Sequence, residues 1–307
     1  MKILVLGAGG IGGYFGGRLA AAGADVTFLV RPRRAEQLKQ NGLVIKSPRG
    51  NLRLSVATVL AEQLQPGYDL VFLTCKAYDL PVAVAAIAPA MGPHTAVLPA
   101  LNGILHLDVL NGNFGNDRVL GGLAQIAATL TPEGEIHHLS DFHALTFGEL
   151  SGQRSPRCEK FSSLCANAGF SSRLSDNIWL ELWEKFVFLC TLAGMTCLMR
   201  ASVGAITRSE DGEALMREML EECRRVAAAS GYEPRPEVLA LYGTKLTERS
   251  SDFTASMLRD IERGGPTEGD HIVGDMLRRA RRLDIETPLL RVAFCHLQAY
   301  EAMRAAQ

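Results

Sequence analysis

The sequence lacks a strong net charge and a regular cysteine pattern. Its 307 residues contain 32 Lys and Arg against 33 Asp and Glu, which leaves a net charge of −1. A nearly neutral chain has no general electrostatic attraction for nucleic acid or for an anionic membrane, so we expect neither as a partner. The seven cysteines are scattered and form no Cys-x-x-Cys pair. This pattern argues against a disulfide scaffold or a zinc site, and it indicates a reducing compartment.

Export and membrane signals are also lacking. The apolar run KILVL at residues 2–6 is too short for a signal peptide and leads straight into glycines. The longest uncharged apolar run, residues 186–199, has the length of a buried helix and not of a membrane span. We therefore expect a cytoplasmic protein. With 47% hydrophobic residues, the chain is long enough for two domains.

The start of the chain contains a nucleotide-binding pattern. A strand-like run over residues 1–6 precedes a loop that fits G-x-G-x-x-G, and a helical stretch and a second strand-like run follow. The loop is Gly7-Ala8-Gly9-Gly10-Ile11-Gly12. Gly7 permits a tight turn, Gly9 lets the backbone approach a pyrophosphate, and Gly12 lets the helix pack close to the strand. With phosphate-attracting amides at the helix N-terminus, this context predicts a dinucleotide site. A purely structural glycine turn is the alternative.

The second predicted strand, residues 25–30, ends at Arg31, with Arg33 and Arg34 just beyond. Proteins that prefer NAD place an Asp or Glu at this point to bind the ribose 2′-hydroxyl. A guanidinium instead pairs with a phosphate through two hydrogen bonds. Arg31 therefore favours NADPH over NADH, and a solvated basic turn leading into a helix is the alternative.

Two kinds of pattern divide the chain. Up to about residue 150, short strand-like runs such as 68–74 and 96–98 alternate with helical stretches, which predicts a parallel sheet covered by helices. Further predicted elements are strands over 117–126 and 135–147 and a helix over 156–168. Beyond residue 177 we expect helices alone. They cover residues 177–200, 209–231, 234–249, 252–263, 268–283 and 288–305, the last beginning at Thr287-Pro288.

The predicted fold class is α/β, with an N-terminal Rossmann-type doubly wound sheet and an all-α C-terminal domain. We place the NADPH-binding domain at residues 1–175 and the helical substrate and catalytic domain at residues 176–307. In open α/β sheets, ligands bind at the carboxyl ends of the strands. We therefore expect the active cleft between the two domains, facing those strand ends.

Polar residues follow two of the predicted strands. Lys76 comes after the strand at 68–74, and Asn102 comes after the strand at 96–98. Lys76 is either a cation near the nicotinamide ribose or substrate carboxylate, or a loop lysine in solvent. Asn102 stands before a glycine, which is turn chemistry, but its amide could also lie beside the nicotinamide. The residue types alone leave both questions open.

Three further polar residues stand in the helical half. Lys185 lies at the edge of an apolar helical stretch, where a lysine either extends to solvent or lines a cleft. Glu181, four residues earlier, is a possible partner on the same face. Ser256 opens the densest polar segment of the chain, and Glu268 follows a Gly-Gly-Pro break. An acid in the first turn of a helix is also favoured by the helix dipole, so a structural role for Glu268 stays open.

Together these motifs resemble the ketopantoate reductase (2-dehydropantoate 2-reductase) family over almost the whole chain. The matching strings are GAGGIGG at Gly7, VR at Arg31, LTCKAYD around Lys76, LNG at Asn102, TFGEL at residues 146–150, ELWEKF around Lys185 and SMLRDIERGGPTEGDHIVG from Ser256. The last string is the most specific. The family reduces ketopantoate to (R)-pantoate with NADPH in the pathway to pantothenate and coenzyme A.

The resemblance implies a role for each matching residue. Lys185 and Glu268 are the implied catalytic residues, the lysine stabilising the ketone oxygen and donating a proton. Ser256 and Asn102 are implied to bind the substrate. The implied cofactor-binding residues are Gly7, Gly9, Gly10, Ile11, Gly12, Arg31, Lys76 and Asn102. The implied partner is a small 2-keto acid, with no metal, and the implied assembly is a monomer or a homodimer.

One departure from the family pattern concerns the substrate. The family commonly places asparagines one and two turns after the catalytic lysine, and this chain has Leu189 and Ala193 there. A site without those amides is expected to accept a less polar 2-keto acid. Two alternatives therefore accompany ketopantoate reduction: a reductase of another 2-keto acid, and a catalytically silent NADP(H)-binding sensor.

Overall fold

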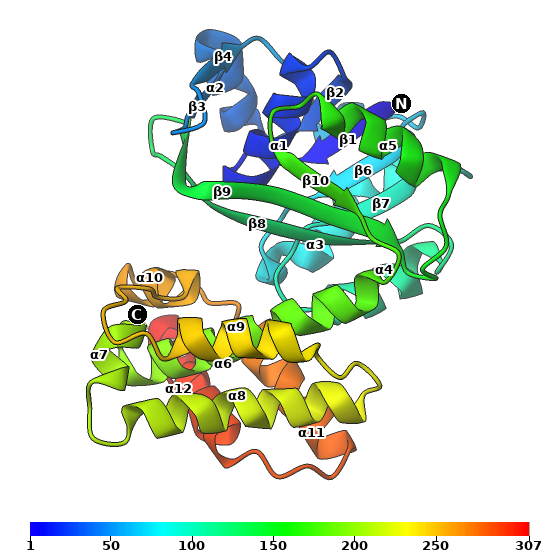
Figure 1. The fold of residues 1–307 in the computed structure, drawn as a ribbon. Coiled ribbons are helices and arrows are strands. Elements are labelled where there is room, and N and C mark those ends of the chain that lie inside the picture. The colour runs from blue at the N-terminus through cyan, green and yellow to red at the C-terminus, as the bar shows by residue number, and fades with distance from the viewer. Residues whose placement is uncertain (307) are drawn as a thin grey trace. The chain divides into compact units, whose positions relative to one another are not determined.

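The computed structural model describes residues 1–306, which form two compact units. The first unit contains residues 1–101 and 106–178, and the second contains residues 102–105 and continues from residue 179. The strands belong to the first unit, and the second unit is helical (Figure 1). The short segment 102–105, which follows a strand of the first unit, belongs with the helical unit. The predicted division at residue 175 did not anticipate this insertion.

A parallel sheet carries the start of the chain. Its strand order is β5-β2-β1-β6-β7, with β1 at the centre. The strands are β1 (Lys2–Leu6), β2 (Asp25–Leu29), β5 (Ala57–Val59), β6 (Leu70–Leu73) and β7 (Ala96–Pro99), and the connecting helices include α1 (Gly10–Ala21), α2 (Pro32–Asn41), α3 (Leu80–Ile87) and α4 (Leu105–Phe114). Leu6 pairs with both Leu29 and Leu73, so β1, β2 and β6 end at the same edge. This confirms the predicted Rossmann-type sheet and brings the segments after three strands to one edge.

A second sheet completes the first unit. Its strands are β3 (Leu43–Lys46), β4 (Leu52–Leu54), β8 (Leu120–Leu130), β9 (Glu135–Glu149) and β10 (Ser171–Leu174), and α5 (Pro156–Ala166) connects the last two. The long strands β8 and β9, which include the strands predicted over 117–126 and 135–147, pair in antiparallel fashion. Strands β3, β4, β5 and β10 were not predicted, and each is only three or four residues long.

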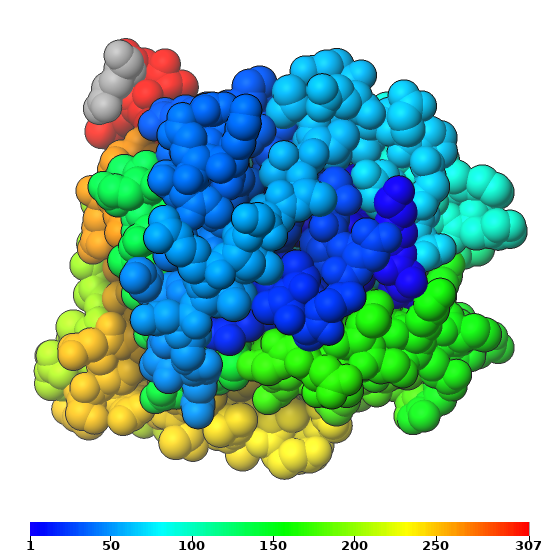
Figure 2. Space-filling model, turned by 90° about the horizontal axis from the view of Figure 1, so that it is seen from above, coloured from blue at the N-terminus to red at the C-terminus, as the bar shows by residue number. Residues whose placement is uncertain are grey.

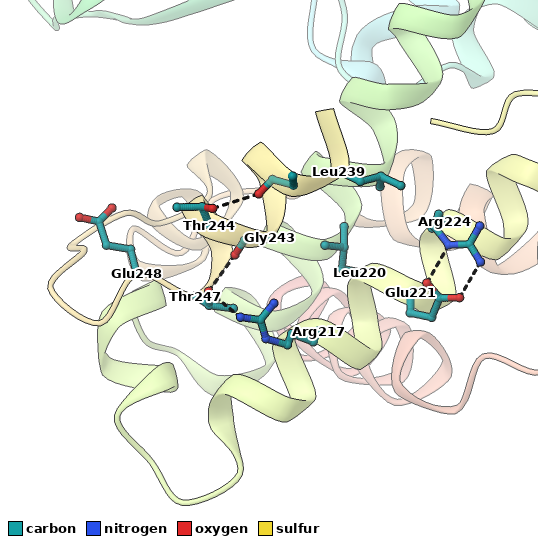
Figure 3. Close-up of a pocket in the computed structure, with 10 residues that line it drawn as sticks. Arg217, Leu220, Glu221, Arg224, Leu239, Gly243, Thr244, Thr247 and Glu248 are labelled. Atoms are coloured by element: carbon teal, nitrogen blue, oxygen red, sulfur yellow. Dashed lines mark hydrogen bonds and ion pairs between the residues drawn. The ribbon is translucent and has the colours of Figure 1, made fainter. Parts of the chain in front are cut away.

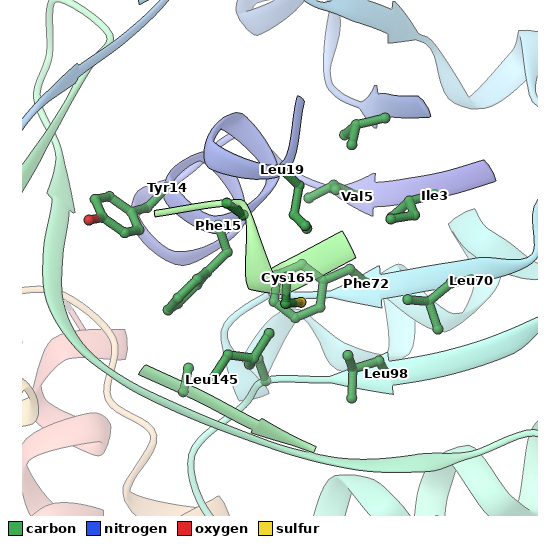
Figure 4. Close-up of a cluster of buried hydrophobic side chains, with 14 of the residues drawn as sticks. Ile3, Val5, Tyr14, Phe15, Leu19, Leu70, Phe72, Leu98, Leu145 and Cys165 are labelled. Atoms are coloured by element: carbon green, nitrogen blue, oxygen red, sulfur yellow. The ribbon is translucent and has the colours of Figure 1, made fainter. Parts of the chain in front are cut away.

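Helix α1 packs between the two sheets because its glycines permit close approach on two faces. A Cβ added at Gly16 would lie 2.9 Å from the Phe28 ring in β2. A Cβ added at Gly17 would lie 2.5 Å from Leu43 Cδ2 in β3. Figure 4 shows the resulting core, where side chains of α1 meet those of β1, β6 and β7, with Leu145 contributed by β9. The packing of α1 thus fixes the glycine loop that precedes it.

The second unit is built from helices, with no strand among residues 179–306. The elements are α6 (Ile178–Met199), α7 (Val203–Thr207), α8 (Gly212–Ala229), α9 (Pro236–Leu246), α10 (Ser256–Glu262), a π-helical turn (Asp270–Gly274), α11 (Asp275–Arg282) and α12 (Pro288–Ala305). This confirms the predicted all-α character; α7 and the π-helical turn are additions. By length and composition α6 could cross a membrane, but 72% of its most apolar stretch is buried inside the protein.

Candidate functional site

The glycine loop of the first unit has the geometry of a phosphate-binding turn. Gly7 has φ +87°, and its amide donates to the Leu29 carbonyl of β2 at 2.9 Å. A Cβ at Gly12 would lie 2.5 Å from the Gly7 carbonyl oxygen, so only glycine fits there. At Gly9, by contrast, an added Cβ would meet nothing within 4 Å. The loop is therefore closed on the protein side and open beside Gly9, where the first amides of α1 have no carbonyl of the preceding turn to bind.

Gly10 has an additional reason to be glycine. A Cβ at this position would lie 2.7 Å from the main-chain oxygen of Ala128 in β8. Glycine is therefore required at position 10 for packing against the second sheet, independently of any role in ligand binding. The sequence analysis missed this reason because β8 follows more than a hundred residues later.

The basic segment after β2 contains two arginines in different environments. Arg31 is the residue before α2, and its carbonyl accepts from the amides of Arg34 and Ala35 at 2.9 and 3.0 Å. Its side chain is exposed. Figure 2 shows the face on which these N-terminal segments, coloured blue, reach the surface. The Arg34 guanidinium is partly buried and bonded to the main chain. The Arg31 side chain is therefore accessible to a phosphate group in solution.

Lys76 lies beyond the end of β6, at the same sheet edge as the glycine loop. Its carbonyl accepts from the Asp79 amide at 2.9 Å, which starts a short 3₁₀ turn over Ala77–Asp79. Lys76 is partly buried. The structure thus places Lys76, Arg31 and the loop along one edge of one sheet, as parallel strand ends require.

The second unit brings Lys185 and Glu268 into electrostatic contact. Lys185 lies on α6 with part of its side chain exposed, yet burial of its amine lowers the pKa to about 8, although the Glu268 carboxylate acts in the opposite direction. Glu268 is only 5% exposed and lies just before the π-helical turn. A buried amine beside a buried carboxylate is a typical environment for a proton-transferring group. The structure therefore gives the two predicted catalytic residues a shared environment.

Asn102 belongs to the same unit as Lys185 and Glu268, and its neighbour Gly103 packs closely there. A Cβ on Gly103, which has φ +76°, would lie 3.1 Å from Cδ2 of His271. The segment that contains Asn102 is therefore packed on the π-helical turn that follows Glu268. His271 is buried, and burial lowers its pKa against the opposing effect of Glu268. No role was predicted for His271, and the only sign of it in the sequence is its position three residues after Glu268.

Ser256 and the two apolar residues after Lys185 complete the predicted set. Ser256 is exposed and is the first residue of α10. Leu189 is partly buried and Ala193 is buried, one and two turns beyond Lys185 on α6. The helix face beyond the lysine is therefore apolar. The substrate-binding role of Ser256 remains a prediction.

A surface groove of about 560 Å³ lies between α8 and α9 (Figure 3). It is lined by Arg217, Leu220, Glu221, Arg224, Leu239, Ala240, Gly243, Thr244, Thr247 and Glu248, and it includes none of the predicted site residues. Among its lining residues, Arg224 and Glu221 form an ion pair at 2.7 Å. This groove is separate from the candidate site. Within residues 1–306, no three His, Cys, Asp or Glu side chains gather to hold a metal.

The comparisons with known proteins agree with the motifs. Residues 3–152 match the family described as ketopantoate reductase PanE/ApbA, and residues 177–301 match its C-terminal part. The chain belongs to the ketopantoate reductase family. Members of this family are oxidoreductases, and this chain is an oxidoreductase of the same kind.

Individual relatives cover nearly the full length. An uncharacterised oxidoreductase of Bacillus subtilis, YkpB, is 37% identical over 302 residues, or 98% of this chain and 99% of that protein. A 2-dehydropantoate 2-reductase of Mesorhizobium japonicum is 30% identical over 312 residues, 94% of each chain. Among solved structures, D-mandelate dehydrogenase with NADH and anilino(oxo)acetate has a TM-score of 0.88 at 23% identity, covering 99% of this chain and all of that one. This last likeness concerns the fold.

Proposed function

We propose that this protein reduces ketopantoate to (R)-pantoate with NADPH, as a cytoplasmic enzyme of pantothenate and coenzyme A biosynthesis. The observation that carries the proposal is the electrostatic interaction between the Lys185 amine, whose pKa burial lowers, and the buried Glu268 carboxylate. The named relative from Mesorhizobium japonicum supports the substrate. We propose the site residues implied by the family motifs and a monomer or homodimer as the assembly.

The first unit fits a nicotinamide dinucleotide. Its glycine loop is open beside Gly9, and Gly12 allows the helix to begin close to the strand. Arg31 offers an exposed guanidinium at the end of β2, where NAD-specific proteins carry an acid. Lys76 and Asn102 would lie beside the nicotinamide. When bound, the cofactor supplies a hydride to the carbon of the ketone.

In the proposed mechanism, Lys185 stabilises the charge that develops on the ketone oxygen and then donates a proton to it. Glu268 favours the ammonium form of Lys185, because its carboxylate raises the pKa that burial lowers. Ser256 binds the substrate carboxylate, and Asn102 fixes the substrate or the nicotinamide. Positioned acid catalysis of this kind typically contributes ~10²–10⁴-fold to the rate.

A second candidate is the reduction of a less polar 2-keto acid on the same scaffold. It is favoured by Leu189 and Ala193, which leave the α6 face beyond Lys185 without hydrogen-bonding side chains. A pocket that does not bind the hydroxyl of ketopantoate discriminates only weakly in its favour. The same reaction chemistry serves both candidates, since only the side chain of the substrate differs.

The test is a turnover assay that follows the loss of NADPH absorbance as the cofactor is oxidised. The matched substrates are ketopantoate and 3-methyl-2-oxobutanoate, which has the same branched skeleton without the hydroxymethyl group. If the site binds the hydroxyl of ketopantoate, kcat/KM should favour ketopantoate by at least about tenfold, and this result would support the first candidate. A preference for the unhydroxylated acid would establish the second candidate. Binding of NADPH without turnover of any 2-keto acid would indicate the sensor.

The same assay tests the role of Lys185. In Lys185→Ala, we expect turnover to fall by at least ~10²-fold while NADPH binding is retained, because the lost group acts on the substrate oxygen. Near-normal turnover in this variant would contradict the mechanism.

A further inference from the structure

Arg34 is the third residue of α2, and its guanidinium bonds to three separate parts of the first unit. One terminal nitrogen, Nη2, donates to the Ala8 carbonyl at 2.9 Å. The other, Nη1, donates to the Gly134 carbonyl at 2.9 Å and to Gln37 Oε1 at 3.3 Å. The third nitrogen, Nε, is buried and has no hydrogen-bond partner. The guanidinium is thus held by three protein oxygens, and its buried Nε donor is left unsatisfied.

All three of these oxygens belong to neutral groups. Among residues 1–306, no carboxylate forms an ion pair with Arg34. The acids of neighbouring segments are engaged elsewhere or exposed: Glu36 accepts from Gln40, and Glu135 pairs with His137. A partly buried cation without a counter-charge is costly, and burial accordingly lowers the pKa of Arg34. The folded protein therefore maintains a positive charge here that it does not neutralise itself.

The position of this charge is informative because Ala8 lies inside the glycine loop. The Arg34 side chain joins that loop to the turn between β8 and β9, where Gly134 has φ +91°. A Cβ at Gly134 would lie 2.6 Å from Arg34 Nη1, so the turn leaves room for the guanidinium only because it has glycine there. The guanidinium thus fixes the Ala8 peptide within the loop to which the dinucleotide phosphates are expected to bind.

We propose that Arg34 is a positioning residue of the cofactor site, which holds the glycine loop through the Ala8 carbonyl and supplies a positive charge that the cofactor pyrophosphate balances. This inference rests on the proposed nicotinamide dinucleotide binding. It differs from the role proposed for Arg31, which concerns the 2′-phosphate alone. The pyrophosphate is common to NADPH and NADH, so Arg34 acts on both cofactors, whereas Arg31 distinguishes them.

The test compares Arg34→Gln, which removes the charge, with Arg34→Lys, which keeps it. Dissociation constants for NADPH and NADH are measured by titration calorimetry at two salt concentrations, together with Tm. We expect Arg34→Gln to raise both constants by about 10-fold to 100-fold, with their ratio unchanged and a weaker dependence on salt. Arg34→Lys is expected to recover most of the affinity.

Arg18→Gln is the matched control. Arg18 also donates to main-chain oxygens and has a buried Nε without a partner, but it lies at the C-terminal end of α1. We expect this variant to lower Tm and to leave both dissociation constants unchanged.

Three results would overturn the inference. If Arg34→Gln and Arg34→Lys lower Tm equally and the salt dependence of binding stays that of the wild type, Arg34 has a structural role only. If Arg34→Gln weakens NADPH much more than NADH, Arg34 binds the 2′-phosphate and not the pyrophosphate. If the wild-type protein binds neither nucleotide, the proposed function fails and this inference fails with it.

Discussion

At the scale of single residues, the ionisation of Lys185 decides what the site can do at neutral pH. Burial lowers the pKa of this amine to about 8, and Glu268 limits that decrease. Below this pKa the residue is mainly an ammonium ion, able to donate a proton to a ketone oxygen. Above it the residue is mainly a neutral amine, able to accept a proton from an alcohol. The environment thus brings the pKa of the proton donor close to neutral pH, as general acid catalysis favours.

The predicted consequence is a pH profile that depends on Glu268. For ketone reduction, kcat/KM should decrease as the pH rises through about 8, because the ammonium form of Lys185 is then lost. In Glu268→Gln, the carboxylate that raises the lysine pKa is removed, so the midpoint should move to lower pH. Steady-state kinetics across the pH range measures both midpoints.

Glu181→Gln is the control for this prediction. Glu181 lies one turn before Lys185 on α6, yet the carboxylate that raises the lysine pKa is that of Glu268. Removal of the Glu181 charge should leave the midpoint where it is. A midpoint that moves with Glu181 and not with Glu268 would reassign the partner of Lys185.

The sequence contained much of this residue-scale information. The positions of Gly7, Arg31 and Lys76 were predictable because each follows a strand, and parallel strand ends share an edge. The role of Arg34 was not predictable, since its partners Ala8 and Gly134 come from a loop and a distant hairpin turn. Local patterns identify residues that a motif requires; they do not reveal pairs formed by packing.

At the scale of elements, the start of α12 shows the same limit. The Thr287-Pro288 pair correctly predicted where the helix begins, but Thr287 makes no side-chain capping bond. The buried Glu222 of α8 performs this function by accepting from the Leu289 and Leu290 amides at 3.0 and 2.9 Å. The capping group comes from another helix more than sixty residues earlier, so no pattern around residue 287 reveals it.

This arrangement predicts a large stability effect at Glu222. In Glu222→Ala, the buried Leu290 amide and the partly buried Leu289 amide lose their acceptor, and we expect the free energy of unfolding to fall by about 2–4 kcal/mol. Glu222→Gln keeps one acceptor oxygen and should lose less. Glu218→Ala, at an exposed position of the same helix, should change stability by less than about 0.5 kcal/mol. Denaturant titration measures all three, and equal losses for Glu222→Ala and Glu218→Ala would contradict the capping role.

At the scale of the whole molecule, the two units divide the proposed chemistry. The glycine loop, Arg31 and Lys76 belong to the first unit, whereas Lys185 and Glu268 belong to the second. The chain enters the second unit at Asn102 and leaves it again after residue 105, so this short segment contributes Asn102 to the unit that holds Lys185. The proposed reduction therefore needs residues of both units, whereas the proposed phosphate-binding residues belong to the first alone.

The last prediction uses this division. A ligand that binds only the folded state stabilises it by RT ln(1 + [L]/Kd), about 2.7 kcal/mol at 100 times Kd. For a unit of this size, that corresponds to an increase in Tm of roughly 5–10 °C. At equal concentration, NADPH should therefore raise the Tm of the first unit more than NADH does, because Arg31 contributes to NADPH alone. In Arg31→Ala the two increases should become equal, whereas Arg33→Ala, at the exposed neighbouring arginine, should keep the difference. Scanning calorimetry measures these shifts, and equal shifts already in the wild-type protein would show that Arg31 does not bind the 2′-phosphate.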